Sequence, residues 1–157
     1  MAETLGSLVD KLTIKSIREF HLEEILKLKK PKFPKKQVKH KLAMLKKQKS
    51  LFFKEIDQFV SLAFQGKIHL REEKLKLYNR PQDMGKIGKI STIPQAIDTL
   101  ARKNLELWHL EDEARRNDVP LSYIGKIKKK IDLANQQRND LIDKLDELLE
   151  TKVKKRR

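Results

Sequence analysis

The chain has 157 residues, no cysteine and a formal net charge of +15, and apolar and charged residues each make up 38% of it. This length suits a single domain, and the lack of cysteine excludes disulfide bonds, thiolate metal sites and a cysteine nucleophile. No apolar run approaches the roughly 20 residues of a membrane-spanning helix, and residues 1–4 do not resemble the start of a signal peptide. We therefore expect a soluble, cytoplasmic protein with no transmembrane segment.

The apolar periodicity predicts four amphipathic helices, at about residues 5–29, 36–64, 93–116 and 121–149. Pro31 and Pro34 separate the first two helices, because proline lacks a backbone N–H and disfavours a helical residue before it. Residues 65–92 form a connector, and residues 151–157 form a basic tail. Long helices with two short turns and one long crossover predict an all-α four-helix bundle in one domain, residues 1–157.

The first hairpin, residues 5–64, looks like a copy of the second, residues 93–150. A shift of 88 residues places the His-Leu-Glu string that begins at His21 on the one that begins at His109. A shift of 89 residues then aligns the apolar positions of the second helix with those of the fourth. The two copies differ by one residue at the turn, and we infer an internal duplication.

The second and fourth helices each carry an apolar seam with alternating steps of four and three residues, which is typical of coiled-coil packing. The seams are Val38, Leu42, Leu45, Lys49, Phe52, Ile56, Phe59 and Ala63 in one helix, and Ile127, Ile131, Ala134, Arg138, Leu141, Leu145 and Leu148 in the other. One cation interrupts each seam at the matching place. Because facing residues of an antiparallel hairpin have numbers with a constant sum, we predict that Asp98 pairs with Arg138 and that Asp10 pairs with Lys49.

Imidazole and carboxylate groups recur in the second copy. His109, Glu111, Asp112 and Asp140 are candidate catalytic residues. With Asp143 added, the carboxylates echo the carboxylate-lined pockets of all-helical nucleotide pyrophosphatases, which would make the protein a metal-dependent nucleotide or phosphoester hydrolase. The preferred interpretation is that these groups cap, pair and orient the helices, with no metal and no cofactor. A large aromatic beside a seam, as at Trp108, is expected in the core.

Basic residues are unevenly placed: from Ile25 to Lys54 there are twelve lysines and no acidic residue. Eight of them surround the first turn, and we call these residues the basic tip: Lys27, Lys29, Lys30, Lys32, Lys35, Lys36, Lys39 and Lys41. Such a surface can bind nucleic acid, an acidic protein or an anionic lipid surface through counterion release. A solvated lysine-rich face without a partner is the alternative. Lys86 and Lys89 precede the third helix, whose N-terminus can hold a phosphate; a plain connector is the other interpretation there.

The strings at residues 108–112 and 135–142 resemble an uncharacterised bacterial family, a domain of unknown function. Its members carry Trp-His-Leu-Glu-Asp followed by Asn-Gln-x-Arg-x-Asp-Leu. The resemblance covers the second hairpin and implies a helical bacterial cytoplasmic protein, without implying any activity, cofactor or catalytic residue. The first copy departs from this signature, because Phe20 stands where the second copy has Trp108.

Together these patterns favour a non-enzymatic binding or interaction module that contacts an anionic partner through the basic tip. The metal-dependent hydrolase and non-specific nucleic-acid binding are the alternatives. Formation of a homo-oligomer stays open, as does the question of whether the two turns lie at the same end of the bundle.

Overall fold

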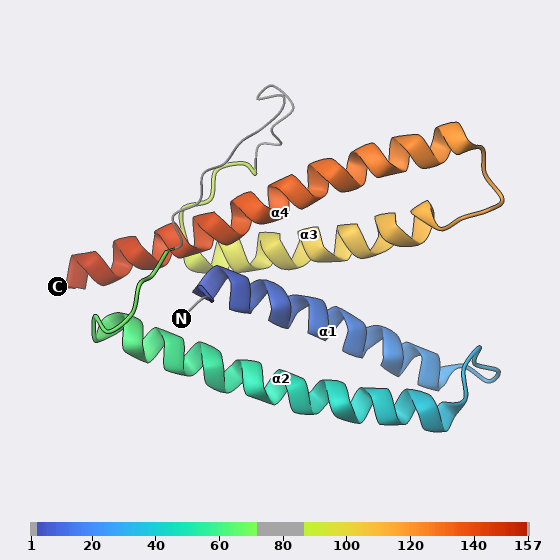
Figure 1. Ribbon diagram of the computed structural model, residues 1–157, viewed down its shortest axis with the longest axis horizontal. Coiled ribbons are helices and arrows are strands. Elements are labelled where there is room, and N and C mark those ends of the chain that lie inside the picture. Colours follow the sequence, from blue (N-terminus) through green and yellow to red (C-terminus); the bar gives the residue numbers. More distant parts are fainter. Residues whose placement is uncertain (1–2, 72–86, 157) are drawn as a thin grey trace.

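The computed structural model describes residues 3–71 and 87–156. Within these ranges the chain forms four helices and no strand, which confirms the all-α four-helix bundle (Figure 1). The helices are α1 (Leu5–Lys27), α2 (Lys35–Phe64), α3 (Ile93–Ala114) and α4 (Leu121–Arg156). Most of the predicted connector, residues 72–86, lies outside the described residues.

Helix α4 is longer than predicted, since it continues through most of the expected basic tail to Arg156. The reason is that Val153 extends the inward stripe of Leu145 and Leu149 at helical spacing. The side chain of Val153 is only 1% exposed. The lysines that follow Leu149 are therefore presented on a helix.

Both α1 and α3 begin with a capping box, in which a side chain of the first turn and the N-cap threonine satisfy each other's backbone N–H groups. Thr4 accepts from the backbone N–H of Ser7, and Ser7 accepts from that of Thr4. Thr92 and Gln95 form the same arrangement at α3. A threonine forms the N-cap of both helices.

The helices form two antiparallel hairpins whose turns lie at the same end of the molecule, on the right of Figure 1. The hairpins converge at the opposite end, near the two termini, and diverge toward the turns. Helix α1 contacts all three other helices, whereas α2 packs chiefly on α1. The inner helix of the first hairpin therefore joins the two hairpins.

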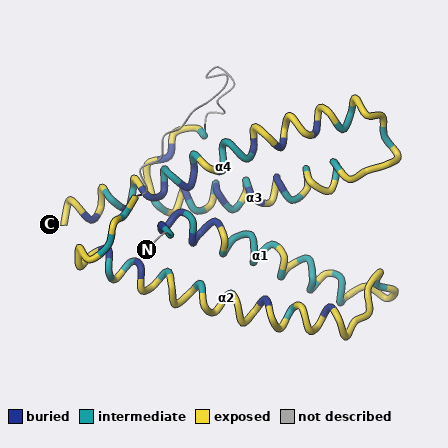
Figure 2. The backbone as a smooth tube through the Cα atoms, in the orientation of Figure 1, coloured by how far each residue is buried: buried dark blue, intermediate teal, exposed yellow. Residues whose placement is uncertain are grey.

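The main hydrophobic core lies where the hairpins converge, and Figure 2 shows that the tips are mostly exposed. Its most deeply buried side chains are Phe59, Ala63, Ala96, Leu100, Leu141, Leu145 and Val153. A smaller cluster of Leu107, Ile127, Ile131 and Ala134 holds α3 to α4 nearer to their turn. All members of both predicted seams are buried or half-buried, so the seam prediction is confirmed.

The first turn of α1 lies directly against α4. The backbone N–H of Gly6 donates to Oδ1 of Asp146 over 2.7 Å, and Asp146 is only 4% exposed. A carboxylate at a helix N-terminus interacts favourably with the free N–H groups and the helix dipole. A Cβ on Gly6 would overlap the carbonyl group of Ile142, so this close approach requires glycine.

Candidate functional site

The predicted pair of Asp98 and Arg138 is wrong. Asp98 is exposed and binds Arg102 on its own helix, at 2.9 Å, whereas Arg138 lies 3.6 Å from Oδ1 of Asp10 on α1. Asp98 is two residues from the core residue Leu100, which turns it roughly 200° around the helix, away from α4. The carboxylate beside Arg138 therefore comes from the other hairpin.

The predicted pair of Asp10 and Lys49 is also wrong, because Lys49 binds Glu19. Asp10 and Glu19 are nine residues apart, so they lie about half a turn from each other on opposite faces of α1. Glu19 faces α2, where it also approaches Lys46 at 3.9 Å. Asp10 faces α3 and α4 instead.

A buried polar network fixes that face of α1. Nδ2 of Asn104, on α3, donates to Oδ1 of Asp10 at 2.8 Å and to Oγ1 of Thr13 at 2.7 Å. The hydroxyl of Thr13 donates in turn to the backbone carbonyl of Asp10. Asp10 and Asn104 are 6% and 4% exposed. The network sets the rotation of α1, and so directs the next turn of this helix toward α3 and α4.

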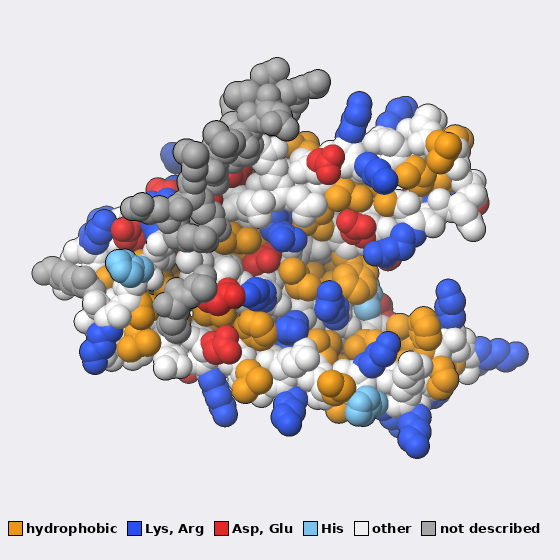
Figure 3. All heavy atoms as spheres, viewed as in Figure 1, with side chains coloured by type: hydrophobic (Ala, Val, Ile, Leu, Met, Phe, Trp, Pro, Cys, Tyr) orange, Lys and Arg blue, Asp and Glu red, His pale blue; other side chains and the backbone are white. Residues whose placement is uncertain are grey.

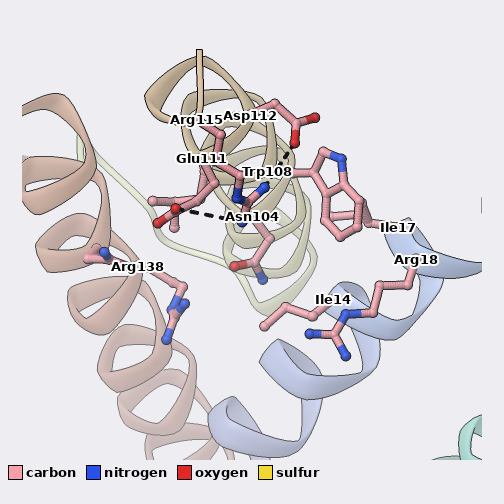
Figure 4. Close-up of a pocket in the computed structure, with 11 residues that line it drawn as sticks. Ile14, Ile17, Arg18, Asn104, Trp108, Glu111, Asp112, Arg115 and Arg138 are labelled. Carbon is pink, nitrogen blue, oxygen red and sulfur yellow. Dashed lines mark hydrogen bonds and ion pairs between the residues drawn. The ribbon is translucent and has the colours of Figure 1, made fainter. Parts of the chain in front are cut away.

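A cavity of about 260 Å³ opens next to this network, where α1 diverges from α3 and α4. We call it the inter-hairpin cavity. Figure 4 shows side chains from the three helices around it, with Arg18 on α1, Arg138 on α4 and Trp108 on α3. It is lined by Ile14, Ile17, Arg18, Asn104, Leu107, Trp108, Glu111, Asp112, Arg115, Asn135 and Arg138. Cations, amides and an aromatic ring thus share one concave surface.

Trp108 forms a wall between this cavity and a second hollow of about 470 Å³, which also involves α2. Its ring stacks on the imidazole of His21, with centroids 4.7 Å apart and planes 12° from parallel. Trp108, which was expected in the core, is half-buried and lies outside both core clusters. His109, from the similar string on α3, meets His21 edge to face at 6.5 Å. The two similar strings of the sequence therefore lie side by side.

Two of the carboxylates considered for metal binding pair with arginine. Asp112 and Glu111 lie 3.1 Å and 4.0 Å from the guanidinium of Arg115, one turn further along α3. Among the described residues, no group of three or more histidine, aspartate or glutamate side chains could hold a metal ion. The metal site considered as an alternative, from Glu111, Asp112, Asp140 and Asp143, does not form such a group. The catalytic role of His109 and Asp140 remains a prediction.

The basic tip is exposed as the sequence predicts. All eight of its lysines are exposed, and none of them has an ion pair within the described chain. Phe33, in the turn, is 48% exposed. Figure 3 shows lysine and arginine side chains on both tips, with an open notch between them.

Ion pairs neutralise the turn of the second hairpin. Arg116 lies 3.1 Å from Glu113 and 2.9 Å from Asp118, and the hydroxyl of Tyr123 donates to Glu113 over 2.7 Å. The Tyr123 hydroxyl and the Arg116 guanidinium hold the pKa of Glu113 below its ordinary value. Arg116 likewise lowers the pKa of Asp118, and the hydrogen bond to Glu113 raises the pKa of Tyr123. The two turns therefore differ in charge although they lie at the same end.

The proposed phosphate position before α3 receives little support. Gln95 and Thr92 already bind the backbone N–H groups of Ser91, Thr92 and Gln95 at this N-terminus. Lys89 is exposed, and Lys86 lies outside the described residues. The N–H donors of these three residues are therefore occupied by the protein itself.

Several lining residues were not predicted from the sequence. Arg18 and Arg115 look like ordinary surface cations in the helical pattern, and Asn135 lies outside the predicted seam. One signal was available: Asn104 occupies an inward position of α3, and a buried amide needs hydrogen-bond partners. Its partners on α1 could have located the cavity.

None of the helices in the described ranges is both long and apolar enough to cross a membrane. No curated protein and no solved structure matches the chain. Residues 94–157 match the family described as "Protein of unknown function (DUF4254)". This match begins in the first turn of α3 and runs through α4, so it covers the second hairpin and the residues that this hairpin contributes to the inter-hairpin cavity. The second hairpin therefore matches an uncharacterised domain family, which confirms the expected resemblance to a domain of unknown function.

Proposed function

We propose that the protein is a non-enzymatic binding module that contacts an anionic partner through the basic tip. The observation that carries this proposal is the absence, within the described chain, of ion pairs to any of the eight lysines. Like charges so close together repel one another, and a polyanion relieves that repulsion while it releases its own counterions.

Comparison of the two turns supports the same proposal. The second turn has a similar helical hairpin, yet Glu113 and Asp118 neutralise Arg116 there. The cation of the second turn therefore has acidic partners close by in the sequence, whereas the first turn has none, since residues 25–54 include no acidic residue. The excess on the first turn is better explained by contact with a partner.

The open end of the bundle enlarges the positive surface. Four further exposed lysines lie near the second turn, on the first part of α4: Lys126, Lys128, Lys129 and Lys130. Because both turns lie at the same end, a long polyanion such as a nucleic acid can meet both groups of lysines. Salt screens such exposed charges, with a screening length of about 8 Å at physiological ionic strength, so binding through them should weaken as salt is added.

A salt-dependent binding titration tests the proposal. The probes are duplex DNA, RNA and vesicles with anionic lipid. The tip variant changes Lys29, Lys30, Lys32, Lys35 and Lys36 to Gln. A matched control removes five exposed cations at the opposite end, by changing Lys67, Lys152, Lys154, Lys155 and Arg156 to Gln.

We expect the wild type and the control to bind at least one probe, and the tip variant to bind it much more weakly. For duplex DNA, the slope of log K against log salt should fall by about 0.9 for each phosphate that the variant no longer neutralises. Equal weakening in both variants, or no binding of the wild type to any probe at physiological salt, would contradict the proposed role of the tip.

A further inference from the structure

Two buried side-chain nitrogens in the described chain have no hydrogen-bond partner, Nε2 of His21 and Nε of Arg138. Buried polar atoms are normally paired, so each such atom requires an explanation. Both residues line hollows beside Trp108: Arg138 lines the inter-hairpin cavity, and His21 lines the second hollow. The two unpaired groups therefore flank one aromatic ring.

The charges around the inter-hairpin cavity leave two guanidinium groups available. Arg115 is paired with Glu111 and Asp112. Arg18, by contrast, has no ion pair within the described chain, and it lines both hollows. In the described chain Asp10 is the one carboxylate within ion-pair distance of Arg138, and the Oδ1 atom that faces Arg138 already accepts a hydrogen bond from Asn104.

Two arginines on different helices are suited to an anion with several oxygens. A guanidinium offers five N–H donors in a planar fork that matches a phosphate or a carboxylate. Arg18 comes from α1 and Arg138 from α4, and Figure 4 shows both on the walls of the same cavity. An anion held between them would also bridge the two hairpins.

The other residues that line the cavity indicate which further chemical groups such an anion contains. Trp108 offers an aromatic surface, and Ile14, Ile17 and Leu107 add apolar contacts. Glu111 and Asp112 accept hydrogen bonds from hydroxyl or amino groups. A volume of about 260 Å³ is just below the usual range for ligand pockets, about 300–1,000 Å³, so a small ligand is required.

We propose that the inter-hairpin cavity binds a nucleoside monophosphate or a closely similar ring-bearing phosphate. Its phosphate lies between Arg18 and Arg138, and its planar ring lies against Trp108. This site is independent of the basic tip, because it uses none of the eight lysines. The phosphate then accepts a hydrogen bond from Nε of Arg138, which has no such partner within the described chain.

Trp108 makes the test direct, because it is the single tryptophan of the chain. Adenosine monophosphate is titrated into the full-length protein while tryptophan emission is recorded, with calorimetry as a second measurement. Adenosine, ribose 5-phosphate and inorganic phosphate are the comparison ligands. They separate the contribution of the ring from that of the phosphate.

The key variant is Arg18→Gln, because Arg18 is exposed and lies outside the buried network, so the fold should be retained. Its matched control is Arg102→Gln: Arg102 is an exposed arginine of α3 that pairs with Asp98 and does not line the cavity. The basic-tip variant with five Gln substitutions is a second control. Circular dichroism verifies that each variant is folded.

We expect adenosine monophosphate to change Trp108 emission in a saturable way and to bind more tightly than any of the three comparison ligands. Arg18→Gln should raise its dissociation constant about tenfold or more, since a charge-assisted hydrogen bond is removed. Arg102→Gln and the tip variant should bind as the wild type does. The proposal is overturned if adenosine monophosphate does not bind, if Arg18→Gln binds equally well, or if the tip variant loses this binding.

Discussion

Substitution of Gly6 by alanine provides a sensitive test of how α1 packs on α4. An added Cβ would overlap the carbonyl oxygen of Ile142 and lie 3.0 Å from its carbonyl carbon. These are backbone atoms of α4, which cannot rotate away as a side chain could. The first turn of α1 must therefore move, and this movement also lengthens the hydrogen bond from Gly6 to Asp146.

Three contributions determine how far Gly6→Ala changes the free energy of unfolding. Overpacking in a well-packed region costs about 1–3 kcal/mol. Loss of a hydrogen bond to a charged group costs about 1.5–3 kcal/mol. The better helix propensity of alanine returns up to about 1 kcal/mol. The net decrease in the free energy of unfolding is then about 2–5 kcal/mol, which lowers Tm by roughly 4–20 °C for a chain of this size.

Urea and thermal denaturation followed by circular dichroism measure this change, and Gly125→Ala is the matched control. Gly125 is also within a helix, but a Cβ there would meet nothing within 4 Å. The control should be stabilised by up to about 1 kcal/mol, through helix propensity alone. If Gly6→Ala were as stable as the wild type, the close approach of α1 to α4 would be refuted.

Three further substitutions test other parts of the structure. Asn104→Leu removes the partner of Asp10 and Thr13 and should lower the free energy of unfolding in urea by about 2–4 kcal/mol; an unchanged midpoint would contradict the buried network. Thr92→Ala should cost about 1 kcal/mol in thermal denaturation through loss of the N-cap, and no change would argue against the capping box. Because the pKa of Glu113 is lowered in the folded state, its ionised form stabilises the fold above its ordinary pKa of 4.5, and this contribution is lost as the pH falls through the lowered value. Glu113→Gln should therefore lose less stability on acidification than the wild type, as measured by urea midpoints across this range, and a parallel loss would refute the assignment.

The helices and their inward faces were predictable because the signals that define them are local. Alternating steps of four and three residues located the buried seams, including Phe59 on α2 and Leu141 on α4. The end of α4 was missed, because a single valine at position 153 outweighed the charges around it.

The ion pairs were not predictable from a hairpin register alone. A constant sum of residue numbers identifies which residues of a hairpin lie at the same height along its axis. It does not identify which face of the helix each residue occupies. Asp10 points out of its own hairpin and toward Asn104 and Arg138 of the other one. Such contacts depend on how two hairpins dock, which no pattern within either of them specifies.

The inter-hairpin cavity was missed for a related reason. It exists because two hairpins that pack tightly at one end diverge at the other, and this divergence depends on the whole fold. The residues that line it are scattered over the chain, from Ile14 to Arg138. The exposure of the basic tip, in contrast, followed from composition and from the turn, and there the sequence was sufficient.

The sharing of α1 between the hairpins has a mechanical consequence. Since α2 rests chiefly on α1, the half of α2 next to the turn is held by few buried side chains, chiefly Val38 and Leu45. Local opening is least costly where few apolar contacts hold an element, so this half should show faster amide exchange than the half that contains Phe59. The turn-side half of α2 can therefore separate from α1 while α1, α3 and α4 stay joined by the polar network. A ligand that bridges α1 and α4 would stabilise the contact between these two helices without restricting the motion of α2.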